Sequence, residues 1–130
     1  MDLLAKIQSL STSGMSAQTD RLRHVSENIA NADTPGYHRK LSAFEQVYQA
    51  GRPTGEVAAG DTMLDQTALE RVYDPAHPMA DGDGYYQGSN VNLIVEIADA
   101  REAQRSYEAN LKMFDHARQM KASLLDLLKR

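Results

Sequence analysis

Residues 91–130 read VNLIVEIADAREAQRSYEANLKMFDHARQMKASLLDLLKR, without a proline or a glycine. Mostly apolar side chains recur in this segment at steps of three or four residues, which is the period of one helix face. The members of this row are Ile97, Ala100, Gln104, Tyr107, Leu111, Phe114, Ala117, Met120, Leu124 and Leu127. Most residues between them are charged. The pattern therefore predicts one long amphipathic helix over residues 91–130.

This predicted helix is too long to be buried by its own chain. At 1.5 Å per residue it would measure roughly 55–60 Å, whereas a compact domain of this chain length is only about 28 Å across. The 130 residues include two Phe and no Trp, so large side chains that could build a self-sufficient core are scarce. We therefore expect the helix to need partner helices.

Residues 2–32 predict a second long helix, because a similar row recurs there. Its members are Leu4, Ile7, Ser11, Met15, Gln18, Leu22, Val25, Ile29 and Ala32. Gly14 lies inside this helix, where glycine costs about 1 kcal/mol relative to alanine. Two interpretations remain open: a frayed helix, or a place where neighbouring backbones come close. The helix should stop at Asp33-Thr34-Pro35-Gly36, because Pro35 lacks an amide donor and biases Thr34 away from helix.

Residues 37–90 have a different character, with recurrent glycine and proline. Residues 41–90 contain two Lys or Arg and eight Asp or Glu, which is a net charge of −6. Residues 43–48, 56–58 and 69–73 are candidate strands, and residues 74–78 and 81–84 have the composition of turns. Asn90 and Asn92 are candidate caps of the following helix.

The predicted fold is mainly α. Two long terminal helical segments, residues 1–36 and 91–130, flank a small, polar, irregular and partly β insert, residues 37–90. A hairpin of two helices would leave much of each apolar row in water. We therefore expect coiled-coil packing in an assembly, with the helix ends partly disordered before assembly.

No group of residues has the spacing of a catalytic or metal site. The chain has no cysteine, so disulfides, thiolate ligands and cysteine nucleophiles are excluded. The four histidines are scattered, without the spacing of metal ligands, and are expected at the surface or in packing: His24, His38, His77 and His116. We expect no enzymatic activity, no metal and no cofactor.

The acidic residues of the insert do not form a site either. Asp61, Asp65 and Glu70 are expected to be solvated loop charges, because nothing pairs them as general acid and base. The Asp81-Gly82-Asp83-Gly84 segment lacks three of the residues that a calcium loop starting at Asp81 requires. A solvated turn is the better interpretation of that segment.

Charge and hydropathy exclude other classes of partner. The formal net charge is −4, which disfavours nonspecific nucleic-acid binding. No run of 18 apolar residues occurs, and the N-terminus lacks a basic region followed by an apolar core, so we expect no cleaved signal peptide. Arg101 and Arg105, at i and i+4, are interpreted first as a solvated face. The alternative is that they meet acidic surface on a neighbouring copy.

Residues 26–39, SENIANADTPGYHR, resemble the N-terminal motif of bacterial flagellar axial proteins, the subunits of rod, hook and hook-associated structures. Residues 102–110, EAQRSYEAN, resemble the matching C-terminal motif. Residues 72–81, 84–85 and 90–92 are similar to the short proximal rod subunits of the basal body, although residues 87–89 lack an expected proline. The residues that carry the two motifs are Asn28, Ala30, Asn31, Thr34, Pro35, Gly36, Tyr37, Arg39, Gln104, Arg105, Tyr107 and Asn110.

The resemblance implies a non-enzymatic structural subunit of the proximal rod in the bacterial flagellar basal body. Such subunits form a hollow drive shaft that transmits torque from motor to hook and encloses the export channel. Expected partners are copies of the chain, other rod subunits and, during secretion, the flagellar type III export apparatus. Direct binding to lipid or nucleic acid is not expected. The side chains expected to pack helices together are Leu22, Val25, Ile29, Leu111, Phe114, Met120, Leu124 and Leu127.

Two points remain open from the sequence. Asn28 and Asn31 are expected to hold the exit of the Thr34-Pro35-Gly36 turn through hydrogen bonds, because buried amide groups without partners are costly; the alternative is that they only cap the helix. Within the family, the alternative is another type of short rod subunit. Outside it, the alternatives are an amphipathic helical module that binds a partner or a membrane, and a hydrolase supported only by scattered Ser, His and Asp.

Overall fold

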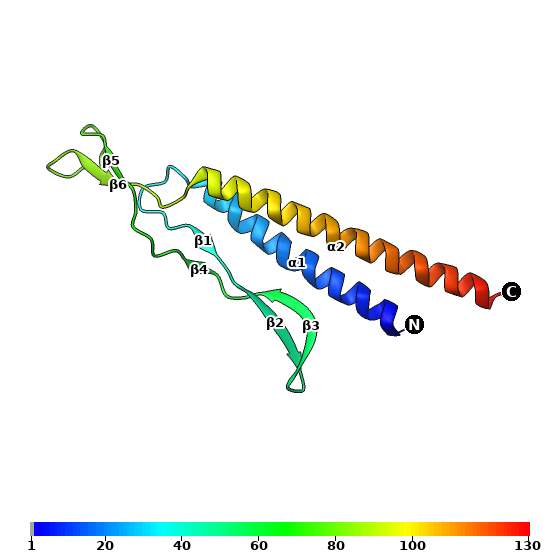
Figure 1. Cartoon of the computed structure of the whole chain (residues 1–130). Coiled ribbons are helices and arrows are strands. Elements are labelled where there is room, and N and C mark those ends of the chain that lie inside the picture. Colours follow the sequence, from blue (N-terminus) through cyan, green and yellow to red (C-terminus); the bar gives the residue numbers. More distant parts are fainter. Residues whose placement is uncertain (1) are drawn as a thin grey trace.

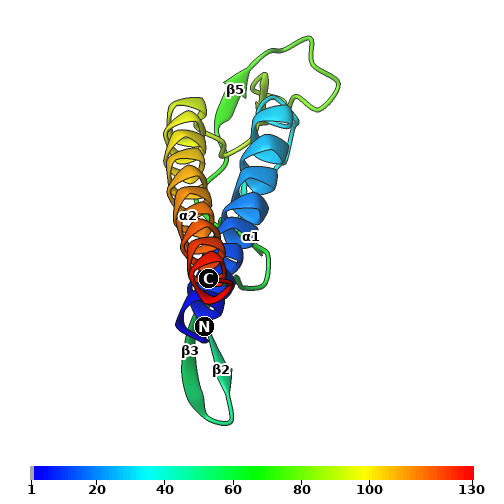
Figure 2. The same cartoon turned by 90° about the vertical axis from the view of Figure 1, so that its right-hand side faces the viewer.

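The computed structural model describes residues 2–130 and contains two long helices, α1 (Asp2–Ala30) and α2 (Leu93–Leu128). The helices lie side by side and antiparallel, so both ends of the chain lie at the same end of the molecule (Figures 1 and 2). An insert of short strands connects them at the other end and returns along α1. The prediction of a mainly α layout with two terminal helices and a partly β insert is confirmed.

The helix boundaries follow local sequence signals. α1 ends at Ala30, two residues before the expected position, because residues 31–36 already form turns. Asn92 caps α2: its side chain accepts a hydrogen bond from the Ile94 amide at 3.0 Å. Asn90, the other candidate cap, has a different role that is described below. Neither helix is long and apolar enough to cross a membrane.

The insert forms three separate antiparallel strand pairs rather than one sheet. The candidate strands at residues 43–48, 56–58 and 69–73 overlap three of the six strands. The other three strands, of two or three residues, had no sequence signal, because such short elements show no alternation. The pairs are β1 (Lys40–Leu41) with β4 (Met63–Leu64), β2 (Phe44–Gln49) with β3 (Arg52–Ala59), and β5 (Arg71–Tyr73) with β6 (Tyr85–Gln87).

The β2–β3 hairpin packs against α1. Ala50 and Gly51 both have positive φ, as a tight two-residue hairpin turn requires. The Val57 amide of β3 donates to the Ser13 hydroxyl at 3.3 Å, and the Ser9 hydroxyl donates to the Glu56 carboxylate. The insert therefore has no core of its own and uses α1 as its support.

The two helices meet through small and polar side chains. A Cβ atom added to Gly14 would lie only 2.7–2.8 Å from three atoms of the Asn110 side chain. α1 continues as a helix through Gly14, so this glycine marks a close approach of α2 rather than a frayed segment. One row of buried residues in each helix has a spacing of seven or fourteen positions, which places its members on one helix face. The rows are Leu4, Ser11, Gln18 and Val25 on α1, and Glu96, Ala103 and Ala117 on α2.

Most of the large side chains expected to pack helices together lie elsewhere. Of the eight large apolar residues that the sequence analysis expects between helices, only Val25 is buried within the chain. Leu22 and Phe114 are half-buried. The others are exposed: Ile29, Leu111, Met120, Leu124 and Leu127. The periodicity identified helix faces, but the face between α1 and α2 is the one with small side chains.

α2 extends past the start of α1 (Figure 1). Because Gly14 lies opposite Asn110, Asp2, twelve residues earlier in α1, lies opposite Ala122. Residues 123–130, here called the C-terminal overhang, therefore have no part of α1 opposite them. Four leucines of the overhang are exposed: Leu124, Leu125, Leu127 and Leu128.

Candidate functional site

The residues of the N-terminal motif gather where α1 ends and α2 begins, and Asn28 is the centre of this junction. Asn28 has no exposed surface. Its Oδ1 accepts hydrogen bonds from the Lys40 amide at 2.7 Å and from the Tyr37 hydroxyl at 2.9 Å. Its Nδ2 donates to the Lys40 carbonyl at 2.9 Å and to Glu96 Oε2 at 3.3 Å. All four polar sites of the side chain are used, so Asn28 ties the returning chain and α2 to the end of α1.

The turn after α1 is held by a second set of hydrogen bonds. Asn31 Nδ2 donates to the Glu27 carbonyl at 2.8 Å, and the Thr34 hydroxyl donates to Asn31 Oδ1 at 3.1 Å. Gly36 has φ +76°, a conformation that favours glycine. Its amide lies 3.0 Å from the Gly88 carbonyl, which attaches the turn to the segment after β6. Asn31 therefore contacts the turn directly, whereas Asn28 binds the chain that follows the turn.

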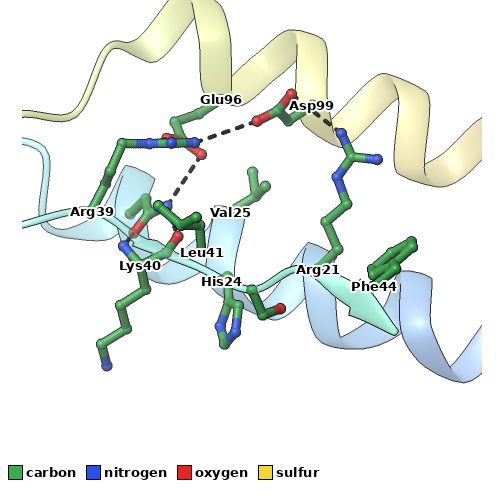
Figure 3. Close-up of a pocket in the computed structure, with 11 residues that line it drawn as sticks. Arg21, His24, Val25, Arg39, Lys40, Leu41, Phe44, Glu96 and Asp99 are labelled. Atoms are coloured by element: carbon green, nitrogen blue, oxygen red, sulfur yellow. Dashed lines mark hydrogen bonds and ion pairs between the residues drawn. The ribbon is translucent and has the colours of Figure 1, made fainter. Parts of the chain in front are cut away.

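Arg39 and Glu96 form the charged part of the junction (Figure 3). Arg39 Nε lies 2.7 Å from Glu96 Oε1, and the Glu96 side chain has no exposed surface. Arg39 also lies 3.4 Å from both Asp65 and Asp99. Burial by itself would lower the pKa of Arg39, but its bonds to Glu96 and Asp65 raise that pKa above its ordinary value. Arg39 therefore stays charged and neutralises a fully buried carboxylate.

Asp99 links this network to α1. Arg21 Nη2 lies 3.3 Å from Asp99 and 3.2 Å from Glu102. Asp99 therefore lies between two arginines, Arg39 from the insert and Arg21 from α1, as Figure 3 shows. The first two turns of α2 are thus connected to both other parts of the molecule.

The expectation that Asp65 is a solvated loop charge is wrong. Its side chain is only 23% exposed and contacts Arg39. Hydrogen bonds from the hydroxyl and amide of Thr67, together with Arg39, hold the pKa of Asp65 below its ordinary value. Asn90 completes this side of the junction: its Oδ1 accepts from the Arg39 amide at 2.6 Å, and its Nδ2 donates to the carbonyls of Asp65 and Thr67 at 2.9 and 3.0 Å.

Two further groups lie at the edge of the junction. Lys40 and Glu27 form an ion pair at 3.0 Å, which raises the pKa of Lys40 and lowers that of Glu27. Burial raises the pKa of the Tyr37 hydroxyl, which keeps that group a hydrogen-bond donor to Asn28. These contacts come from residues adjacent in the sequence to Asn28 and Arg39, so the motif is one continuous structural unit.

A cavity of about 390 Å³ adjoins the network, between α1 and the start of β2 (Figure 3). His24 borders it and is almost fully buried; its Nε2 lies 3.4 Å from the Thr62 hydroxyl, and its Nδ1 has no hydrogen-bond partner within residues 2–130. Over the same residues no three His, Asp or Glu side chains are arranged to hold a metal ion. The charged side chains around the cavity are paired with neighbouring charges, so they hold segments of the chain together.

The remaining motif residues make none of the junction contacts described above. Asn110 packs over Gly14 and donates to the Ser106 carbonyl at 2.9 Å. Ala30 is exposed and Pro35 is half-buried. Gln104, Arg105 and Tyr107 are exposed on α2, and Gln104 and Tyr107 line a shallow pocket with Leu22 of α1.

Several junction residues were absent from the sequence interpretation. None of Glu96, Asp99 and Arg21 was singled out in the sequence analysis. One signal was available: Glu96 precedes Ala103, Asn110 and Ala117 at intervals of seven. A carboxylate that continues a row of small residues on one helix face is a candidate for a buried, paired position.

Comparison with known proteins accounts for both motifs. A family model described as flagella basal body rod protein matches residues 10–38, and one for the C-terminal part of flagellar basal body rod FlgEFG proteins matches residues 83–127. Flagellar basal-body rod protein FlgC of Agrobacterium fabrum is 41% identical over 136 aligned residues, covering 99% of this chain and 98% of that protein. The chain belongs to the FlgC family of flagellar rod proteins.

More distant FlgC proteins match over most of their length. FlgC of Escherichia coli O6:H1 is 32% identical and aligns with 95% of this chain and 97% of its own. FlgC of Aquifex aeolicus is 34% identical, and the alignment covers 81% of this chain and 82% of that protein. These relatives favour the FlgC type over the other short rod subunit type, and they leave no role for the hydrolase alternative. The chain is a structural proximal rod subunit of the bacterial flagellar basal body and not an enzyme.

Proposed function

We propose that this FlgC chain builds the wall of a hollow rod by packing both helices, as coiled coils, against those of neighbouring copies and other rod subunits. The observation that carries the proposal is the position of the large aliphatic side chains, which the chain itself does not cover. Leu111, Leu124 and Leu127 are 42%, 42% and 64% exposed. Exposed aliphatic surface of this extent along a helix is typical of a protein–protein contact.

The C-terminal overhang supports the same proposal. Ala103, Asn110, Ala117 and Leu124 follow one another at intervals of seven on the α2 face that contacts α1. Leu124 lies beyond the start of α1, and it is the first large side chain in a row whose earlier members are small or polar. A helix from a neighbouring subunit can continue along this face and bury the leucines.

The junction gives such a wall its stiffness. A polar network in which each buried group has a partner holds one geometry, because any other geometry leaves buried charges unpaired. Residues 1–36 and 91–130 then act as the assembly unit that lines the export channel, and residues 37–90 pack outside it. Torque from the motor would pass to the hook through these helix contacts.

The proposal includes export through the flagellar type III apparatus. A chain without cysteine and with few large core residues can be unfolded and threaded without breaking covalent bonds. Direct binding to lipid is not part of the proposal, since acidic and basic residues alternate along both helices. Co-sedimentation with anionic liposomes tests this part, and binding would favour the membrane-binding alternative.

The test of assembly is a double substitution in the overhang, Leu124→Asp with Leu127→Asp, in a flagellated host that carries the variant in place of its own subunit. We expect the variant to be exported but missing from isolated basal bodies, with loss of swimming in soft agar. Gln119→Asp with Ser123→Asp adds the same charge at exposed polar positions nearby and is the matched control. If the leucine variant enters basal bodies as well as the control, the proposal is wrong.

A further inference from the structure

The first four turns of α2 carry a shallow groove on the side away from α1. Glu96 and Ala103 face α1, and helix geometry places Arg101 and Arg105 roughly 140–180° around α2 from Glu96. Ile94, at the start of this groove, is 80% exposed. The residues that line it, here called the arginine groove, are Ile94, Ile97, Ala98, Arg101, Glu102 and Arg105.

The two arginines of the groove are not neutralised by their own chain. Within residues 2–130 neither Arg101 nor Arg105 forms an ion pair. Glu102, the only carboxylate of the groove, is paired with Arg21 on the other side at 3.2 Å. Two like charges one helix turn apart are mildly destabilising by themselves. The groove therefore combines aliphatic surface with unpaired positive charge.

The β5–β6 hairpin has the opposite character and projects from the same end of the molecule (Figure 1). Tyr73 and Met79 are 63% and 64% exposed. The segment 70–84 has four acidic residues and one basic residue, Arg71, whose guanidinium lies over the Tyr85 ring at 4.3 Å. Glu70 and Asp83 are exposed, and their side chains have no partner within residues 2–130. The hairpin therefore presents apolar and negatively charged groups together.

The hairpin is also held in one conformation. Asp81 Oδ1 accepts hydrogen bonds from the amides of Asp83 and Tyr85 at 2.9 and 3.0 Å, which lowers the pKa of Asp81. His77 stacks on Tyr86 with ring centroids 3.9 Å apart. Little conformational entropy remains to be lost when such a segment binds.

We propose that the β5–β6 hairpin of one copy docks in the arginine groove of a neighbouring copy. Met79 and Tyr73 cover Ile94 and Ile97, and the carboxylates of the hairpin neutralise Arg101 and Arg105. The occupant is a second copy because the charges of the two surfaces are complementary and neither is satisfied inside the chain. Two different surfaces that meet in this way form a head-to-tail contact, which builds a ring or a helical array rather than a two-fold dimer. The proposal rests on the assembly described above and names one of its contacts.

A charge exchange tests the contact through incorporation into basal bodies and swimming. Arg101→Glu with Arg105→Glu, and separately Glu70→Lys with Asp83→Lys, each place like charges across it. Each pair should lower incorporation by about tenfold or more, and the four substitutions together should restore it. Lys112→Glu with Arg118→Glu changes the charge of α2 equally outside the groove and should have no such effect. If the combined variant does not regain incorporation, or if either pair alone leaves incorporation unchanged, the proposed contact between copies is wrong.

Cross-linking separates failure of this contact from failure of assembly. Because the chain has no cysteine, Asp83→Cys and Arg105→Cys introduce the only thiols. Oxidised basal bodies that contain the double variant should yield a ladder of disulfide-linked multimers, whereas either single variant should yield none. A double variant that is present in basal bodies without forming multimers overturns the docking and leaves the assembly proposal intact. Absence of even the unsubstituted chain from basal bodies contradicts the assembly proposal itself.

Discussion

The two ends of α2 differ in what covers them. At its start, Glu96 has no exposed surface and contacts both Arg39 and Asn28. In the C-terminal overhang, Leu127 and Leu128 are 64% and 79% exposed. A helix of 36 residues is longer than the rest of this chain can cover, so one end is completed within the chain and the other requires neighbours.

The two ends of α2 also differ in the kind of contact that they make. The junction uses charged and amide groups whose partners must be placed within hydrogen-bond distance, so it specifies one geometry. The overhang uses leucine, whose contribution on burial depends on area and only weakly on direction. The chain therefore determines its own shape at the junction and leaves the contact with neighbours to apolar packing.

The largest expected change in the unfolding free energy of the isolated chain comes from removing Arg39. Arg39→Met leaves Glu96 buried without its counter-charge, which should cost about 3–5 kcal/mol. Arg23→Met, which removes a surface pair with Asp20, should cost less than about 1 kcal/mol. Urea unfolding followed by circular dichroism measures both. Equal losses in the two variants would show that the junction is no more important than the surface.

A smaller effect is expected where the helices approach most closely. Gly14→Ala should destabilise the chain by about 1 kcal/mol, since overpacking against Asn110 costs about 1–3 kcal/mol while the gain in helix propensity is about 1 kcal/mol. With Asn110→Ala in the background, the same substitution should become neutral or stabilising. An unchanged cost in that background would mean that Asn110 is not what Gly14 accommodates.

Acid should loosen the junction before it affects the overhang. The pKa of Asp65 is lowered in the folded chain from an ordinary value of 3.8. Its contribution to stability is therefore present above that value and is lost as the pH falls through the lower folded pKa. Asp65→Asn should flatten the dependence of unfolding free energy on pH below pH 3.8. Asp61→Asn removes a carboxylate at an exposed loop position and is the matched control.

The smallest change is expected in the overhang. Leu124→Asp with Leu127→Asp should alter the unfolding free energy of the isolated chain by less than about 0.5 kcal/mol, although it abolishes incorporation. Amide exchange at residues 123–128 should be fast in the dilute chain and slow in basal bodies. The helices α1 and α2 contain 29 and 36 residues, 65 in total. Circular dichroism of the dilute chain should show fewer helical residues than this. Slow amide exchange at residues 123–128 in the dilute chain would show that this end of α2 does not need neighbouring subunits to be stable.

Local sequence was sufficient for the layout of the chain. Period and composition determine both helices. Pro35 and Gly36 shape the turn that follows α1, because proline lacks a donor and glycine accepts positive φ, and Asn92 starts α2 by capping it. The same periodicity identified leucines such as Leu124 and Leu127, which the chain leaves exposed. Each of these features depends on neighbours within a few positions, so it is visible in sequence alone.

Only the tertiary structure decided which helix faces meet and which charges pair. A row of large apolar residues indicates that a helix face will be buried, but not whether its partner lies in the same chain. In this chain the faces with small residues form the contact between α1 and α2, because they allow the closest approach. Arg39 and Glu96 are 57 positions apart, and Asp65 joins them from a loop without any pattern. Pairing over such separations depends on where the whole chain returns, which no local spacing encodes.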